Sequence, residues 1–163
     1  MNTFGIDASA KRFSIIRDEK DITTVLDSNE NEPVFILGGG SNILFTKDFD
    51  GLVIKNEIQG FQMIEENKDF AIIESGAGEV WHEFVMKCID ENLGGIENLS
   101  LIPGNVGASP MQNIGAYGVE VKDIFEYLDA YHIKDKKMRR FNAQECKFGY
   151  RESIFKNESY PKV

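Results

Sequence analysis

The chain has 163 residues, of which 42% are hydrophobic and 28% charged, a balance typical of a soluble globular protein. This length fits one domain or two small subdomains. The net charge of −9 argues against nucleic acid as a partner held by general electrostatics. An anionic ligand would therefore have to be bound locally, by backbone amides or by a few placed cations.

Hydropathy and cysteine usage argue against a membrane protein, a secreted protein and a disulfide-rich protein. No apolar run is long enough for a membrane span, and the N-terminal residues lack the apolar core of a secretory signal. Cys88 and Cys146 are the only cysteines, which excludes a disulfide framework, and their separation does not fit a metal site. These features predict a cytoplasmic protein with no membrane, nucleic-acid or metal partner, and they leave the oligomeric state open.

Hydrophobic patterning in the first half of the chain predicts short strands and one strong helix. The predicted elements are, in chain order, a short surface helix at 19–30, a buried strand at 34–37, and strands at 51–55 and 61–78 with a polar turn at 67–69. Residues 79–92 predict the clearest helix, which ends at Gly94-Gly95. Its apolar face comprises Val80, Trp81, Phe84, Val85, Cys88 and Ile89.

The second half begins with an uncharged loop at 101–118 and then returns to strands. Residues 123–133 and 136–142 predict a strand pair, and 142–146 a short helix capped by Asn142. Strands, one strong helix and strands again indicate an α+β fold rather than regular βαβ alternation.

The first candidate site follows the predicted strand at 34–37 and consists of Gly38, Gly39, Gly40, Ser41 and Asn42. Glycines here let consecutive amides converge into a concave anion nest, to which the Ser41 hydroxyl and the Asn42 amide add donors. The turn is not a dinucleotide fingerprint, because Ile43 stands where the third glycine should be. It is not a P-loop either, because no Gly-Lys-Ser/Thr follows. The alternative is a tight turn between two strands.

The second candidate site is the loop at 101–118, in which two prolines and four glycines disfavour regular structure. A long irregular run inside a compact domain is usually functional or disordered. We expect an ordered loop, because several of its residues are apolar and expected to bury: Leu101, Ile102, Val106, Met111, Ile114 and Tyr117. Its polar groups, Ser109, Gln112 and Asn113, would suit a flat heterocycle in an apolar slot. The alternative is a compact surface loop packed by its own side chains.

Arg151 is the third candidate, because it stands among aromatic residues. Its guanidinium can bind a carboxylate through two parallel hydrogen bonds. Without other information, a structural ion pair with Glu152 or Glu145 is the preferred alternative. The other candidates are expected to be structural: His82, His132, the core residue Trp81, and Arg139 with Arg140 as a solvated pair at a strand end.

Four segments, in this order, resemble the UDP-N-acetylenolpyruvoylglucosamine reductases, flavin enzymes also called UDP-N-acetylmuramate dehydrogenases. They are NTFGID at 2–7, ILGGGSNILF at 36–45, ENLSLIPGNVGASPMQNIGAYGVEV at 97–121 and CKFGYRESIFK at 146–156. The resemblance covers nearly the whole chain. It implies an FAD-binding α+β fold of the vanillyl-alcohol-oxidase (PCMH) type. Its two small α+β subdomains would occupy 1–60 and 61–163, and a separate substrate domain would follow.

The resemblance also implies roles for the candidate residues. The turn at 38–42 would hold the FAD pyrophosphate. The flavin and its ribityl chain would lie against Ile102, Pro103, Gly104, Gly107, Ser109, Gln112, Asn113, Gly115 and Ala116. Arg151 matches the family arginine that binds the enolpyruvyl carboxylate and stabilises the enolate-like charge, with Tyr150 beside it as a substrate-binding residue.

The implied reaction belongs to peptidoglycan synthesis. NADPH donates a hydride to FAD, and the UDP-N-acetylglucosamine enolpyruvyl ether is then reduced to UDP-N-acetylmuramate. The family's proton-donating serine and partner glutamate lie beyond Val163, so Ser109, Ser153 and Glu152 do not take those roles. We expect this chain to be the FAD-binding portion and to be inactive or nearly so alone. A non-catalytic FAD-binding module and another oxidoreductase of the same flavin fold stay open as alternatives.

Overall fold

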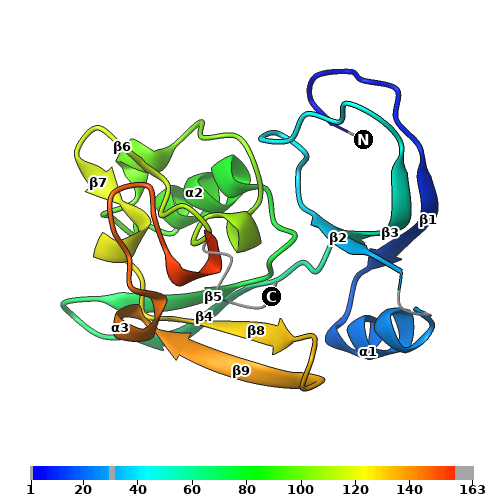
Figure 1. The fold of residues 1–163 in the computed structure, drawn as a ribbon. Helices are drawn as coiled ribbons and strands as arrows, with labels where there is room; N and C mark the ends of the chain where they lie inside the picture. The colour runs from blue at the N-terminus through cyan, green and yellow to red at the C-terminus, as the bar shows by residue number, and fades with distance from the viewer. Residues whose placement is uncertain (1, 30–31, 157–163) are drawn as a thin grey trace.

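The computed structural model describes residues 2–29 and 32–156, and Figure 1 shows their elements in two groups. The first group is a three-stranded parallel sheet with one helix. Its elements are β1 (Ala10–Ile16), α1 (Glu19–Asp27), β2 (Val34–Leu37) and β3 (Phe49–Asn56). The strand order is β1-β3-β2, so β3 is the central strand. Ile16, Leu52 and Ile54 form a small core against which residues of α1 pack.

Strand β1 was not predicted from the sequence. Its residues alternate between half-buried and exposed over the first half, and they include Lys11 and Arg12, which weaken the apolar signal. With α1 and β2 it forms one βαβ unit in which both strands pair with β3 in parallel. The sheet therefore begins one strand earlier than hydropathy indicated.

The predicted surface helix is confirmed as α1, which ends at Asp27. Its N-cap is Asp18, whose carboxylate accepts from the Lys20 amide at 2.9 Å. The Asp21 carboxylate in turn accepts from the Asp18 amide. This reciprocal capping fixes the start of the helix. The predicted strand at 34–37 is also confirmed, but the prediction that it is buried is wrong. Only Leu37 of its four residues is buried, and Ile36 is 41% exposed, because β2 lies at the edge of the sheet.

The second group begins with the antiparallel hairpin of β4 (Phe61–Glu66) and β5 (Ala71–Ser75). The predicted polar turn is confirmed between these strands, where the Asn67 side chain accepts from the Asp69 and Phe70 amides at 2.9 and 3.1 Å. Helix α2 (Trp81–Asp90) follows and confirms the strongest helix prediction.

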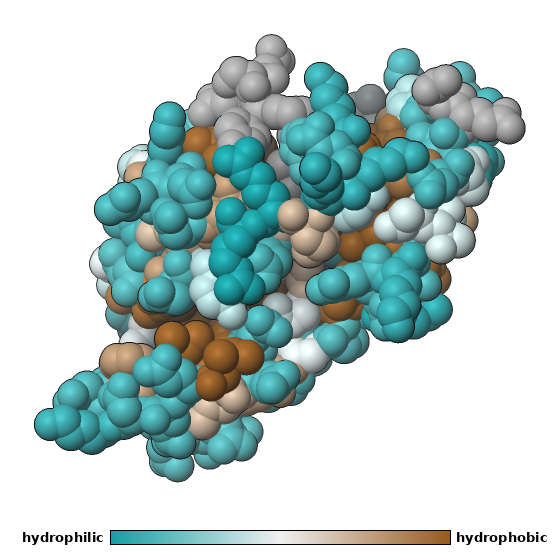
Figure 2. Space-filling view, turned by 90° about the horizontal axis from the view of Figure 1, so that it is seen from below, coloured by the Kyte–Doolittle hydropathy of each residue, from teal (hydrophilic) through white to brown (hydrophobic). Residues whose placement is uncertain are grey.

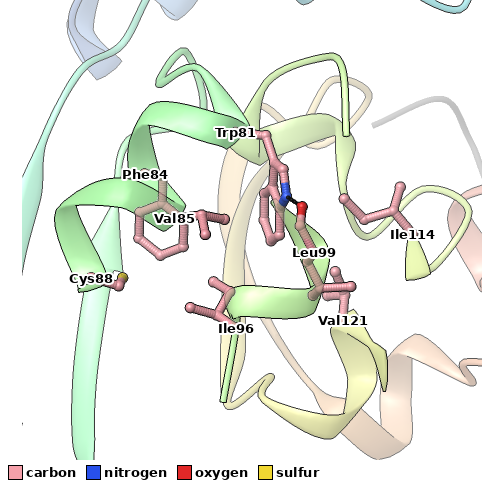
Figure 3. Close-up of a cluster of buried hydrophobic side chains, with 8 residues drawn as sticks. All are labelled: Trp81, Phe84, Val85, Cys88, Ile96, Leu99, Ile114 and Val121. Carbon is pink, nitrogen blue, oxygen red and sulfur yellow. Dashed lines mark hydrogen bonds between the residues drawn. The ribbon is translucent and has the colours of Figure 1, made fainter. Parts of the chain in front are cut away.

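Helix α2 buries Trp81, Phe84, Val85 and Cys88 in the main core, as Figure 3 shows. The indole Nε1 of Trp81 donates to the Leu99 carbonyl at 2.8 Å, so the polar end of the ring is satisfied inside the core. The apolar face predicted for this helix includes two residues that are not buried. Val80 and Ile89 are 44% and 37% exposed, because they lie at the edges of the buried stripe.

Strands β8 (Tyr127–His132) and β9 (Lys137–Asn142) form the predicted antiparallel pair. Helix α3 (Ala143–Cys146) follows, and Asn142 caps it by accepting from the Glu145 amide at 3.0 Å, as predicted. In the view from below, Figure 2 shows a mostly hydrophilic surface broken by hydrophobic patches.

Arg139 and Arg140 are not simply a solvated pair. Arg140 makes two hydrogen bonds, of 2.9 and 2.6 Å, with Asp129, its partner across the strand pair, and its guanidinium carbon lies 3.8 Å from the Tyr127 ring centroid. Arg139 lies over the Phe141 ring at 4.6 Å. Antiparallel pairing places Asp129 directly opposite Arg140, whereas Phe141 lies two positions after Arg139 on the same strand, β9.

Short elements complete the fold. They are the 3₁₀ turns η1 (Glu97–Leu99), η2 (Val106–Ala108), η3 (Val121–Asp123) and η4 (Ile154–Lys156), and the two-residue strands β6 (Gly115–Ala116) and β7 (Val119–Glu120). The loop at 101–118 is therefore ordered as predicted, but it is not wholly irregular. Tyr117 and Gly118 join β6 to β7 with φ values of 51° and 84°, as a tight two-residue hairpin requires.

Both cysteines are free and buried. Burial raises the pKa of each thiol to about 11, with a further contribution from Glu145 at Cys146, so neither is a thiolate at neutral pH. The described residues include no helix with the length and apolar character needed to cross a membrane. Within the same residues, no three histidine, cysteine or acidic side chains gather as a metal site would require.

Candidate functional site

The two glycine-rich candidate segments meet in the structure. A Cβ atom added to Gly39 would lie 2.8 Å from Asn105 Oδ1 and 3.3 Å from the Gly104 Cα atom. A Cβ atom added to Gly104 would lie 3.3 Å from Ser41 Oγ. The turn and the loop therefore approach closely, over a distance that a larger residue at position 39 would not allow.

The turn after β2 presents a row of amide donors. Gly40 has a φ of 70°, and its carbonyl accepts from the Thr3 amide at 3.2 Å, which ties the N-terminal segment to the turn. Within residues 2–29 and 32–156, the amides of 39–42 donate no hydrogen bond to a protein acceptor. Consecutive amides without protein partners are the donor set that an anion nest needs, so these residues fit a pyrophosphate.

The first half of the loop is held by the segment that enters α2. The Gly104 carbonyl accepts from the Trp81 amide at 3.0 Å, the Val106 amide donates to the Glu79 carbonyl at 2.9 Å, and the Gly107 amide donates to the Ala77 carbonyl at 3.0 Å. Backbone bonding to 77–81 thus replaces the regular structure that glycines and prolines prevent, and it keeps this part of the loop ordered.

Asn105 is a site residue that the sequence analysis missed. It is 7% exposed, its side-chain Nδ2 donates to the Gly78 carbonyl at 2.5 Å, and its Oδ1 lies against Gly38 and Gly39. Asn105 therefore lies between the α2 entry and the turn. Nothing in the sequence distinguishes it from other polar loop residues.

Glu79 is the second missed residue, and it is 5% exposed. Its carboxylate accepts from the Gly60 amide and from Lys87 Nζ, both at 3.0 Å. Burial opposes ionisation, but these two hydrogen bonds and the Lys87 charge outweigh it, so the pKa of Glu79 lies below its ordinary value of 4.5. The only sequence signal for this pair was its spacing, with Glu79 just ahead of α2 and Lys87 on the helix.

Asn113 holds the second half of the loop. It is fully buried, its Nδ2 donates to the Gly149 carbonyl at 2.9 Å, and its Oδ1 accepts from the Lys122 amide at 3.0 Å. Ser153 adds a bond from its hydroxyl to the Met111 carbonyl at 2.7 Å. Both polar ends of the Asn113 side chain are thus engaged within the chain, so its contribution to any ligand site is to position the loop.

Tyr150 and Arg151 form the tip of a tight turn. Gly149 and Glu152 exchange backbone hydrogen bonds of 3.0 and 3.2 Å, and Arg151 has a φ of 52°. The Arg151 guanidinium donates to the Gly115 carbonyl, so the tip is joined to the loop, while Tyr150 is 86% exposed.

The ion pair proposed as the alternative for Arg151 is not formed. In the described part of the chain, no carboxylate lies within ion-pair distance of Arg151. Glu145 instead approaches Arg139 at 3.9 Å. The guanidinium of Arg151 is bonded instead to the Gly115 carbonyl, 36 positions earlier in the chain.

The prediction that the loop's apolar residues bury is only partly right. Ile114 is buried, and Ile102 and Val106 pack against the main core. However, the exposed fractions of three others are large: Leu101 76%, Met111 45% and Tyr117 88%. Leu101 and Tyr117 have positive φ values of 62° and 51°, a conformation that costs free energy in a non-glycine residue.

The remaining candidates are placed as follows. Ser109 is buried, Gln112 and Ala116 are half-buried, and Pro103 is exposed. Gly107 and Gly115 are packed so closely that an added Cβ atom would lie 2.6 Å from the Ala77 Cβ and 2.7 Å from the Val119 carbonyl oxygen, respectively. His82 accepts from the Leu101 amide at 3.3 Å, a structural role as predicted.

A sequence model of a known family, described as the FAD binding domain, matches residues 10–139. The chain belongs to the FAD-binding domain family. The match spans both glycine-rich segments and most of the second group of elements. It confirms the prediction of an α+β FAD-binding fold and of FAD as the cofactor.

Individual relatives of this FAD-binding chain bear one name, UDP-N-acetylenolpyruvoylglucosamine reductase. The protein from Flavobacterium johnsoniae is 55% identical over 157 residues, which are 96% of this chain and 47% of the relative. The protein from Pseudomonas aeruginosa is 47% identical over 159 residues, with the same coverage of both chains. The chain spans about half the length of the curated relatives it matches.

A solved structure has the same fold. The crystal structure of UDP-N-acetylenolpyruvylglucosamine reductase from Thermus caldophilus matches with a TM-score of 0.67 at 24% identity. The match covers 85% of this chain and 48% of that one. At this level of identity the likeness supports the fold alone.

Proposed function

We propose that the chain is the FAD-binding part of a UDP-N-acetylenolpyruvoylglucosamine reductase, an NADPH-dependent oxidoreductase of peptidoglycan synthesis in the cytoplasm. The observation that carries the proposal is the 55% identity to a relative of that name over 96% of this chain. We further propose that 1–60 and 61–163 are its two FAD-binding subdomains. The UDP-sugar enolpyruvyl ether would be the small-molecule substrate.

The glycine turn and the loop supply the proposed cofactor site. The turn at 38–42 offers amides with no protein acceptor among the described residues, which suits the pyrophosphate. The loop at 101–118 lies against this turn through Gly104 and Asn105, so the rest of FAD would extend along it. When bound, FAD would supply the hydride-transfer chemistry between NADPH and the enolpyruvyl ether.

Arg151 and Tyr150 are the proposed substrate residues. The guanidinium has five N–H donors, and the bond to the Gly115 carbonyl uses one of its nitrogens. The remaining donors would bind the enolpyruvyl carboxylate and stabilise negative charge that develops next to it. The bond to the loop would hold the arginine beside the flavin-binding segment.

The visible absorption spectrum of the purified chain tests the proposed cofactor site. After addition of FAD and removal of the excess, we expect flavin bands at near-stoichiometric yield. Gly40→Val should abolish the bands, because a β-branched residue is strained at a φ of 70° and would intrude on the phosphates. A folded but colourless parent chain would contradict this site and favour a chain that keeps the fold without the cofactor.

A further inference from the structure

Lys55 lies beside the glycine turn, although the turn motif does not include it. It is the second-last residue of the central strand β3, where the parallel register pairs it with Leu37, the last residue of β2. Its Nζ donates to the carbonyl of Gly38, the residue that follows β2. The ammonium is thus placed at the first residue of the turn whose amides have no protein acceptor.

The charge environment of Lys55 is unusual for this chain. The sequence has 27 acidic and 18 basic residues, and even exposed lysines of this chain have carboxylate partners, as Lys87 has Glu79 and Lys122 has Glu120. Lys55 is half-buried, yet no carboxylate within the described residues lies at ion-pair distance from it. Partial burial of a charge without a counter-ion costs free energy, unless an anionic ligand provides the counter-ion.

We propose that the Lys55 ammonium is a diphosphate-binding group that acts together with the amides of 39–42. The inference rests on the proposed FAD site and adds to it the cation that backbone dipoles alone do not supply. An ammonium has three N–H donors, and one bond to Gly38 leaves two for phosphate oxygens.

The net charge explains why such a cation is needed. At −9, the protein repels a free diphosphate at long range, and physiological salt screens charges beyond about 8 Å. Attraction must therefore come from groups within contact distance. Lys55 is attached to a central strand rather than to a loop, so the protein positions its charge before the ligand arrives.

Binding of inorganic pyrophosphate to the ¹⁵N-labelled chain, followed by NMR, tests the proposal. Lys55→Gln removes the charge while keeping an N–H donor, so the fold should persist. Amide resonances away from position 55 should then have the same chemical shifts in the variant as in the parent chain. Lys47→Gln is the matched control, because Lys47 is an exposed lysine ahead of the same strand. Lys55→Arg restores the charge.

We expect pyrophosphate to shift the amide resonances of 38–42 in the parent chain, in Lys47→Gln and in Lys55→Arg. Lys55→Gln should weaken binding about tenfold, the effect of losing one charge-assisted hydrogen bond. Its affinity should also depend less on salt concentration.

Equal affinities in Lys55→Gln and Lys47→Gln would overturn the proposal, as would the absence of any shift at 38–42 in the parent chain. These outcomes are independent of reductase activity. If pyrophosphate binds as expected but the longer protein does not reduce the enolpyruvyl ether, the proposed function fails and the role of Lys55 stands.

Discussion

The glycine turn at 38–42 and the loop at 101–118 look alike in sequence, but the structure uses their glycines differently. In the turn, the amides of 39–42 have no protein acceptor among the described residues. In the loop, the backbone is bonded to 77–81, and the side chains of Asn113 and Ser153 bond it to other segments. Glycine leaves amide donors available in the first segment, although Gly39 there is tightly packed, and it allows close packing at Gly107 and Gly115 in the second.

This difference shows that glycine content alone does not separate a segment whose amides lack protein acceptors from a tightly packed one. Gly107 and Gly115 lie so close to Ala77 and Val119 that they have a packing reason to be glycine. Gly38, by contrast, would meet nothing closer than 3.5 Å with an added Cβ atom. The deciding property is where the backbone hydrogen bonds go, which depends on the tertiary structure.

The largest expected effect comes from breaking the loop's side-chain anchor. Asn113→Ala should lower the free energy of unfolding by about 3 kcal/mol, because it leaves the Gly149 carbonyl and the Lys122 amide without their partner. Chemical denaturation measures the loss. Asn98→Ala is the control, since exposed Asn98 makes only a 3.4 Å bond to the same loop, at Tyr117, and should cost less than about 0.5 kcal/mol. Equal losses in the two variants would show that the loop does not depend on Asn113.

A smaller effect is expected where the turn meets the loop. Gly39→Ala should cost about 1 kcal/mol, because its Cβ atom would lie 2.8 Å from the Oδ1 atom of buried Asn105. Gly38→Ala, whose nearest contact is 3.5 Å away, should cost less than about 0.5 kcal/mol. Urea midpoints of the two variants give the comparison. If Gly38→Ala lowers the urea midpoint more than Gly39→Ala does, the turn at 38–42 and the loop at 101–118 do not approach as described.

The smallest effect concerns pH and the base of the loop. The pKa of Glu79 is lowered in the folded state, so its stabilisation is fully present above the unfolded value near 4.5 and is lost as pH falls through the folded value. Thermal melts below about pH 5 should therefore show a shallower loss of stability in Glu79→Gln than in the parent. Glu83→Gln, at an exposed position on helix α2, should keep the parental slope. An unchanged slope in Glu79→Gln would contradict the role of this carboxylate.

The sequence by itself determined the elements that local pattern controls. Helix α2 follows from the spacing of Trp81, Phe84 and Val85, and α3 follows from its Asn142 cap. The turn at 38–42 followed from glycines placed directly after a strand, and the order of four segments indicated the family. These signals are short-range, because helical periodicity, capping and turn chemistry involve residues a few positions apart.

The tertiary structure alone decided the contacts between distant segments. Arg151 reaches Gly115 and Asn113 reaches Gly149, each across 36 positions, and Lys55 reaches Gly38 across 17. Asn105 and Glu79 likewise gain their roles from partners that packing brings near. Hydropathy does not encode which carbonyl or amide a buried polar side chain will meet, because that partner is set by how the elements pack. The sequence therefore indicated the two candidate segments, and the fold determined how they are held together.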